Sequence, residues 1–497
     1  MDTLNFEKNS VLFQKAVDNV GFGRVVIYTN ANYIDRNNIV EELNKALKYH
    51  KMNVEAISYL DRYYRGDQPI LYRTKKVRPE INNRIVENHA LEVVDSKVAD
   101  LFGEPIQYVL GPDETADKAD AIAELNRYMK SEDKAALDIE RGRWASICGT
   151  SFYYIGDTNR MPKLFDEAPY YIKTENPVNT FVVYYSDDDT AAFSVQIRKD
   201  ENNKTLYNIY TPFYFFVIQE DTIILAEENG NDMIPVIEYP NNERRLSDIE
   251  ITIGITDAIN NMQSDRVNAI EQFVQAFILF KNCKIDKETF EQLAFAGALS
   301  IKDAADGKVA DAKMMTSELS QDGTQVSKDD LYTSLLEIQG MPSRQEASGG
   351  DTGQAVALRN GYYAEEKRAE LRIPIFQKSE RMMLRVVLNK LRKFKAPAGY
   401  SLGISDIDIR PNRSKLENML VKAEVLKILH DLGVDDAIAL KTVNLFSDVQ
   451  DVIAKSSERM AAQFESTINN DTEPTVASET EQTNDNESEV DNGETEI

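Results

Sequence analysis

Two stretches decide the fold: residues 61–73, DRYYRGDQPILYR, and residues 82–108, NNRIVENHALEVVDSKVADLFGEPIQY. Asn82 and Asn83 can cap a helix, because a short amide oxygen accepts hydrogen bonds from the free N–H groups of the first turn. Gly103 can end that helix, and the proline two residues later prevents it from resuming. The pattern predicts a buried helix followed by a strand at 106–110. The apolar positions on the helical face are Ile85, Val86, Ala90, Val93, Val94, Val98, Leu101 and Phe102.

The first 240 residues combine helices with a β-rich block. Residues 36–64 contain two runs of helical periodicity, which predict two helices, and residues 114–148 are helical as well. β-branched and aromatic residues dominate 151–239, separated by turn-like residues at 186–190 and 200–204. The predicted strands are 152–155, 180–185, 193–197, 206–210 and 214–218.

After Pro240 helical periodicity takes over. A capping box, Ser247-Asp-Ile-Glu250, opens an amphipathic run that continues to about residue 277 and is longer than an ordinary globular helix. A glycine-rich loop at 340–353 precedes another long helix, which Pro374 is expected to kink. The other predicted elements are short mixed elements at 280–320, a helix at 327–339, a strand at 404–409, and helices at 416–432, 435–445 and 448–464.

Charge and composition narrow the classes of function. The net charge is −26, from 83 acidic and 57 basic residues. This argues against a protein that grips DNA phosphates, but not against one through which DNA passes. No stretch approaches the ~20 apolar residues of a membrane helix, and the N-terminus lacks a secretion-signal pattern. Cys148 and Cys283 could form one disulfide, although reduced thiols in a cytoplasmic setting are the better expectation. Residues 471–496 hold no lysine or arginine, so the tail is predicted to be disordered.

Catalytic and metal-binding patterns are missing from the sequence. It has no phosphate-binding loop with its lysine and no zinc spacing around its three histidines, so we expect no cofactor, no metal and no enzyme. His89 is expected to be structural. The acidic run 187–189 could serve a two-metal nuclease, but a surface turn explains it better. Asp406 and Asp408 are likewise expected on a solvated strand face.

The order of these features resembles the portal proteins of long-tailed, siphovirus-type double-stranded DNA bacteriophages. The resemblance starts with YYRGDQPIL, the Asn-Asn helix start and the LFGEPIQY exit. It continues through NNERRL at 241–246, the loop 340–353, QAVALR at 354–359 and GVDDAIALKTVNLFSDV at 433–449. It therefore covers about residues 35–465.

The resemblance implies an α+β fold that is mainly helical, with a β-rich wing block, a long stem helix, a helical crown and a disordered acidic tail, in a ring-forming portal fold. The implied segments are a wing at 1–246, a stem helix at 247–277, a clip at 278–320, a return stem helix at 321–339, a tunnel loop at 340–353, a long kinked helix at 354–400, a crown at 401–466 and the tail at 467–497.

The function that the resemblance implies is a ring, usually of twelve subunits, at one capsid vertex. Double-stranded DNA enters through its channel, driven by the terminase, and later leaves the same way. The other implied partners are the major capsid and scaffolding proteins and a head–tail adaptor protein. Assembly would occur in the host cytoplasm without a membrane. Two alternatives stay open: another head-morphogenesis or scaffold component, and a DNA-processing enzyme such as a nuclease.

The tunnel loop is the candidate functional site. Its four glycines make the backbone permissive, and a loop of this length is more often functional than passive. Arg344 and Glu346 are the candidates to meet DNA phosphate and to pair with an adjacent subunit, whereas an ordinary exposed helix connector is the alternative. The candidate DNA-channel residues are Ser343, Arg344, Gln345, Glu346, Ser348 and Asp351.

Overall fold

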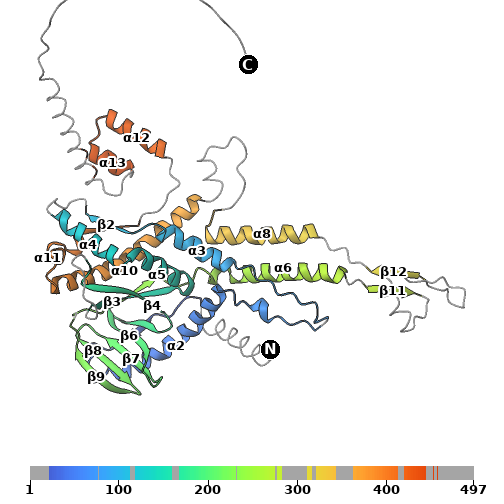
Figure 1. The fold of residues 1–497 in the computed structure, drawn as a ribbon, viewed down its shortest axis with the longest axis horizontal. Helices are drawn as coiled ribbons and strands as arrows, with labels where there is room; N and C mark the ends of the chain where they lie inside the picture. The colour runs from blue at the N-terminus through green and yellow to red at the C-terminus, as the bar shows by residue number, and fades with distance from the viewer. Residues whose placement is uncertain are drawn as a thin grey trace, which may run out of the picture. The chain divides into compact units, whose positions relative to one another are not determined.

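The computed structural model divides the chain into two compact units, Met1–Leu416 and Glu417–Ile497, and each is described by itself. Figure 1 shows their helices and strands. The structure describes residues 22–76, 78–111, 118–158, 167–230, 232–274, 277–281, 311–315, 321–342, 362–411 and 419–443, together with residues 452 and 456.

A six-stranded sheet forms one part of the first unit. Its order is β1-β5-β6-β7-β8-β9, with β1 parallel to β5 and the other neighbours antiparallel. Helix α2, Ile39–Tyr64, covers it, because Ile39, Leu43 and Ala46 fall on one helical face and pack with sheet residues such as Phe193. The strands are β1 Ile27–Thr29, β5 Thr180–Tyr185, β6 Ala191–Lys199, β7 Thr205–Tyr210, β8 Tyr214–Gln219 and β9 Thr222–Glu228.

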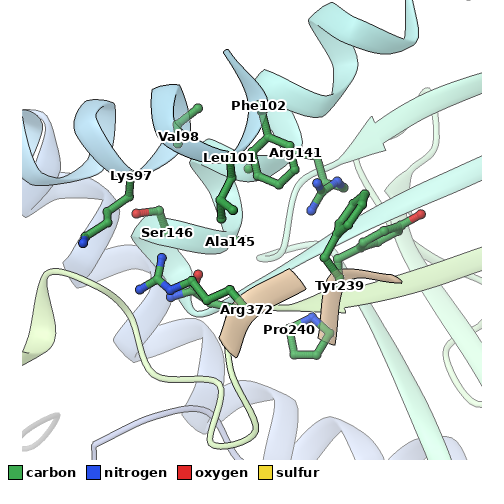
Figure 2. A pocket seen from close by; sticks show the side chains of 13 residues that line it. Lys97, Val98, Leu101, Phe102, Arg141, Ala145, Ser146, Tyr239, Pro240 and Arg372 are labelled. Atoms are coloured by element: carbon green, nitrogen blue, oxygen red, sulfur yellow. The ribbon is translucent and has the colours of Figure 1, made fainter. Parts of the chain in front are cut away.

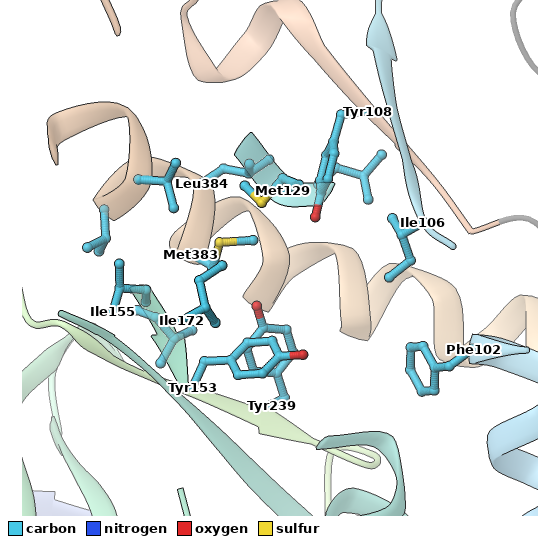
Figure 3. Close-up of a cluster of buried hydrophobic side chains, with 14 of the residues drawn as sticks. Phe102, Ile106, Tyr108, Met129, Tyr153, Ile155, Ile172, Tyr239, Met383 and Leu384 are labelled. Carbon is cyan, nitrogen blue, oxygen red and sulfur yellow. The ribbon is translucent and has the colours of Figure 1, made fainter. Parts of the chain in front are cut away.

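A second core surrounds the long helix α10, Tyr362–Lys393. Met383 and Leu384 of α10 lie among Tyr153 and Ile155 from a three-stranded sheet of order β10-β3-β4 (Figure 3). The pair β13–β2 adds Ile409 and Tyr108 to the same cluster. The elements that make up this part of the unit are β2 Gln107–Leu110, β3 Thr150–Asp157, β4 Tyr170–Glu175, β10 Val236–Pro240, β13 Ile407–Arg410, α3 His89–Phe102, α4 Ala119–Ser131, α5 Lys134–Cys148, α11 Pro397–Ser401 and the 3-10 turn η4 Ile404–Asp406. Another 3-10 turn, η1 Pro69–Tyr72, contacts helix α6, Ile253–Val274.

A buried carboxylate ties α10 to this core. Glu380 accepts hydrogen bonds from the hydroxyls of Tyr108 and Tyr239 and lies 3.0 Å from Lys134 Nζ. Burial opposes its ionisation, but Lys134 and the two tyrosines outweigh burial and hold the pKa of Glu380 below its usual range. Because a buried charge is costly unless it is paired, these contacts fix the position of α10 against the sheet.

Two antiparallel helices lie between β10 and α10 in the chain (Figure 1). Helix α6, Ile253–Val274, follows the 3-10 turn η3, Glu250–Thr252, and α8, Gln321–Gln339, packs against it. Strands β11, Phe277–Lys281, and β12, Asp311–Met315, form an antiparallel pair between them in the sequence. Phe277 was expected in the stem helix; it instead begins β11, because the aromatic and β-branched run 277–280 favours a strand that pairs with β12.

The second unit contains helices α12, Met419–Asp431, and α13, Asp436–Val443. They confirm two of the helices predicted after residue 416, whereas all but residues 452 and 456 of the third prediction, 448–464, lie outside the described residues. The five predicted strands of 151–239 are also confirmed.

Three local predictions were wrong. Residues 36–64 hold one helix, because Asn53 does not interrupt α2 but bonds both backbone polar groups of Val25 (2.8 and 2.9 Å). The helix expected from Ile85 begins at His89 instead. Asp406 is buried in η4, not on a strand face, since its carboxylate accepts hydrogen bonds from Lys118 Nζ (2.9 Å) and Gly403 N–H (2.8 Å).

Candidate functional site

The predicted loop residues Ser343, Arg344, Gln345, Glu346, Ser348 and Asp351 lie outside the described residues. The structure does describe the helices before and after this loop. These are the stem pair, which we define as α6 and α8, and the long helix α10. The candidate site is therefore built from the stem pair, the segment that supports it, and its junction with α10.

The stem pair is held together by both polar and apolar contacts. Arg266 Nη1 of α6 donates to Gln325 Oε1 of α8 (2.6 Å). Near the start of α6, Ile255 packs against the buried Leu335 and Leu336 of α8. These contacts place α8 on one face of α6.

A segment that the structure describes over residues 73–76 and 78–88, hereafter the brace, turns at 78–81 and then runs extended along a different face of α6. The N–H of Asn83 donates to Asn268 Oδ1 (2.7 Å), that of Ile85 to Ser264 Oγ (2.9 Å), and that of Glu87 to Asn260 Oδ1 (2.8 Å). Alternate residues of the brace thus pair with every fourth residue of α6. The three acceptor side chains, Asn260, Ser264 and Asn268, are almost wholly buried.

This ladder explains why the local capping rule failed for Asn82 and Asn83. Asn82 Nδ2 donates to Arg73 O (2.9 Å), and Asn83 Nδ2 donates to Glu271 Oε2 of α6 (2.8 Å). Because α3 begins only at His89, both asparagines lie several residues before its first turn and contact the brace and α6 instead. The sequence signal that was missed is the spacing of Asn260, Ser264 and Asn268, three polar residues every fourth position within an amphipathic helix.

A polar cluster joins the start of α3 to α8. His89 Nδ1 lies 2.9 Å from Glu92 Oε2, and its ring packs 4.9 Å from the ring of Tyr332, whose hydroxyl donates to Glu92 Oε1 (2.8 Å). Lys328 Nζ donates to Glu87 Oε1 (2.6 Å). His89 therefore has the structural surroundings that the sequence predicted, between the start of α3 and helix α8.

The capping box at the start of α6 is partly as predicted. Glu250 Oε2 accepts the N–H of Ser247 (2.7 Å), which is the expected backward bond. Ser247 Oγ, however, accepts the N–H of Ile249 (3.0 Å), one residue earlier than a full capping box requires. The chain therefore enters α6 through η3.

The junction of the stem pair with α10 centres on Asp248. Its carboxylate accepts hydrogen bonds from Arg372 of α10 and from Ser146 Oγ (2.7 Å), and its carbonyl accepts one from Gln339 Nε2 at the end of α8 (2.7 Å). Burial opposes ionisation, but the charge of Arg372 outweighs it and lowers the pKa of Asp248. Lys97 Nζ of α3 donates to the carbonyl of Gln339. Asp248, which lies just before α6 in the chain, thus contacts α8 through its carbonyl and α5 and α10 through its carboxylate.

The side chains around the junction enclose a cavity of only about 30 Å³, lined by Leu101, Phe102, Tyr239 and the stems of Lys97 and Arg372 (Figure 2). This volume suits one or two water molecules and excludes a cofactor. Arg141 lies beside it with its guanidinium 4.3 Å from the ring centre of Tyr239, a cation–π contact. The side chains of the junction therefore pack closely around Asp248 and Tyr239.

Arg368 connects the end of α8 to α10 close to the start of the loop. Its guanidinium donates to the carbonyls of Glu337 and Ile338 in the last turn of α8, a favourable place for a cation. Gly340 follows with φ +63°, where a Cβ would meet Arg368. The last turn of α8, just before the loop, is thus attached to α10.

The remaining sequence candidates are placed as follows. Asp187, Asp188 and Asp189 form an exposed turn between β5 and β6, as predicted. Within the described ranges no three His, Cys, Asp or Glu side chains are arranged to hold a metal ion. The Cys148 thiol is buried and free, and Cys283 lies outside the described residues. None of the helices in the described part of the chain combines the length and apolar character needed to cross a membrane.

Comparison with known proteins identifies the family. The model of the family "Phage portal protein, SPP1 Gp6-like" matches residues 43–469. No curated protein matches the chain significantly. Similar solved structures include "Virion of native gene transfer agent (GTA) particle", 11% identical with a TM-score of 0.44, which covers 78% of this chain and 93% of that one. Another is "Neck of native GTA particle computed with C12 symmetry", 11% identical with a TM-score of 0.42 over 72% of this chain and 89% of that one. On the family match, which spans most of its length, the chain belongs to the SPP1 Gp6-like phage portal proteins, the structural proteins that form the DNA channel of the phage virion.

Proposed function

We propose that this portal protein assembles as a closed homo-oligomeric ring, with twelve subunits in the head, at one capsid vertex. The genome is packaged through its channel by the terminase and is later ejected through it. The family match over residues 43–469 is the observation that carries the proposal. The terminase supplies the ATP-driven motor, and the ring itself has no catalytic activity. Major capsid and scaffolding proteins and a head–tail adaptor protein complete its partners, and assembly takes place in the host cytoplasm.

The described elements support a division of labour along the chain. Residues 1–246 would form the wing, 247–277 the stem helix, 278–320 the clip and 321–339 the return stem helix. The tunnel loop 340–353, the long helix 354–400, the crown 401–466 and the tail 467–497 complete the division. The stem pair, braced on one face and joined to α10 through Asp248, supports the assignment of α6 and α8 to the stem.

Within this division, residues 340–353 project into the channel. Arg344 and Glu346 then meet DNA phosphate and pair with an adjacent subunit. Arg368 of α10 bonds the last turn of α8, and Arg372 of α10 bonds Asp248; these contacts support this role, because movement of the loop would be transmitted to the stem. Replacing residues 343–348 by a short Gly-Ser link should leave the melting temperature nearly unchanged and impair packaging. Normal packaging would exclude the channel role, and loss of rings would place the loop in the subunit interface.

Electron micrographs of the purified full-length protein test the proposal directly, with native mass spectrometry to count subunits. We expect rings with a central channel. Monomers across a wide range of protein concentrations would contradict the proposal and favour a scaffold component. ATP hydrolysis or DNA cleavage that is abolished by a point substitution in this chain would contradict the absence of catalysis.

A further inference from the structure

The stem pair has opposite charges on its two flanks. The brace carries five basic residues between positions 73 and 84 and a single acidic one, Glu80, in a chain whose net charge is −26. Helix α8 has the reverse composition, with four acidic residues and one lysine. The five basic residues are Arg73, Lys75, Lys76, Arg78 and Arg84, and the acidic ones of α8 are Asp322, Asp329, Asp330 and Glu337.

Charges within the chain neutralise the brace only in part. Arg73 and Lys75 share one carboxylate, Asp265 of α6, at 3.0 and 3.4 Å. Lys76 and Arg84 are exposed, and neither forms an ion pair with any residue that the structure describes; the guanidinium of Arg84 donates to a backbone carbonyl, that of Leu71 (2.8 Å). The brace therefore keeps a positive outer surface.

The outward face of α8 is the counterpart. Asp322, Val326, Asp329, Asp330 and Glu337 recur at helical spacing and are all exposed, with Val326 at 69% of its surface. No described lysine or arginine forms an ion pair with the four carboxylates, and the one lysine of α8 is already paired with Glu87. Acidic side chains thus surround the exposed Val326 on this face. An apolar centre with a polar rim is the composition of a protein–protein interface.

The two charged surfaces lie on different sides of α6. The brace contacts α6 through Asn260, Ser264 and Asn268, whereas α8 contacts it through Ile255 and Arg266. At 100° per residue these two sets fall on nearly opposite faces of the helix. Figure 1 shows the same arrangement, with α8 and the extended segment flanking α6. A single stem pair is thus positive on one flank and negative on the other.

We propose that the brace of one subunit docks on the outward face of α8 in the neighbouring copy, with Lys76 and Arg84 meeting Asp329 and Asp330 around Val326. The inference rests on the proposed ring. A ring is closed by head-to-tail contacts, in which two different surfaces of identical chains meet. A positive and a negative flank on the same stem pair provide two such surfaces.

A second copy fits the brace better than DNA does. DNA would explain the basic brace but leave the acidic face of α8 and its exposed valine without a partner, whereas a neighbouring copy uses both. Exposed ion pairs contribute little individually, so their role here is to set the angle and height at which stems meet. If two neighbouring stems met in another orientation, like charges would face each other and oppose the contact.

Charge reversal and charge exchange test the contact. Variants K76E/R84E and D329K/D330K should each reduce the fraction of rings in native mass spectra roughly tenfold or more at fixed protein concentration, because like charges then face each other. The chain carrying all four substitutions should regain rings. The control K48E/K51E makes the same charge change on exposed lysines of α2 and should assemble as the unsubstituted protein does. Circular dichroism verifies that each variant is folded, and K76Q/R84Q offers a milder change if the reversal does not fold.

The outcomes separate this inference from the proposed function. A monomeric unsubstituted protein would overturn both. Rings in the unsubstituted protein, with no recovery in the four-fold variant, would overturn only the inference. Rings that persist in K76E/R84E while DNA packaging falls would also overturn it and assign the brace to DNA.

Discussion

At the scale of single residues, Asp257 shows how burial couples the stem to pH. Its carboxylate accepts a hydrogen bond from the Tyr63 hydroxyl (2.9 Å), and burial raises its pKa to about 6. Because the folded pKa lies above the unfolded one, stability from this group is present below about pH 4 and is lost as the pH rises to 6. The substitution D257N keeps an acceptor for Tyr63 but cannot ionise. The free energy of unfolding of D257N, relative to that of the unsubstituted protein, should increase by about 1–2 kcal/mol between pH 4 and 6 after allowance for solvent screening. Thermal melts of both proteins across this range measure the difference, and a difference independent of pH would contradict the assignment.

At the scale of secondary-structure elements, the brace ladder should be the most sensitive contact of α6. S264A removes the buried acceptor of the Ile85 N–H and should lower the free energy of unfolding by about 1–3 kcal/mol. The matched control is S327A on the exposed surface of α8, where we expect a change within about 0.5 kcal/mol. Equal effects of the two substitutions in urea titrations would show that the ladder adds no stability.

The ladder also marks the limit of sequence-based prediction. Strands such as β5 and β8 were predicted because their periodicity is local. The start of α3 was not, because Asn83 is bound by Asn268, far along the chain. The capping box of α6 was predicted from four adjacent residues, whereas the brace and the Asp248 junction require partners 91 or more residues apart.

At the scale of the whole molecule, the part of the charge imbalance that lies in the C-terminal tail should be separable from assembly. Residues 467–497 contain no lysine or arginine and few apolar side chains, so they cannot contribute a core. A chain ending at residue 466 should therefore form rings with the same subunit number in native mass spectra as the full chain. Failure to assemble, with a circular dichroism spectrum otherwise unchanged, would reveal a structural partner for the tail. The family and the order of segments could be recognised from the sequence because they depend on motifs. The opposite charges on the two flanks of the stem pair could not, because they depend on which face of α6 each neighbour occupies.

The axial repeat of the brace nearly equals the axial repeat of the acceptors on α6. Two residues of extended chain advance about 6.6 Å, and four residues of helix advance about 6.0 Å, so successive rungs nearly coincide and drift apart by about half an ångström each. Three rungs fit within this tolerance, but a long series would not. An axial shift of α6 by a few ångströms would break all three together, whereas a shift by four residues would bring only two of the three acceptors opposite an N–H. The ladder therefore fixes the axial position of α6 within each subunit. Identical copies then hold their stems at the same height before they meet.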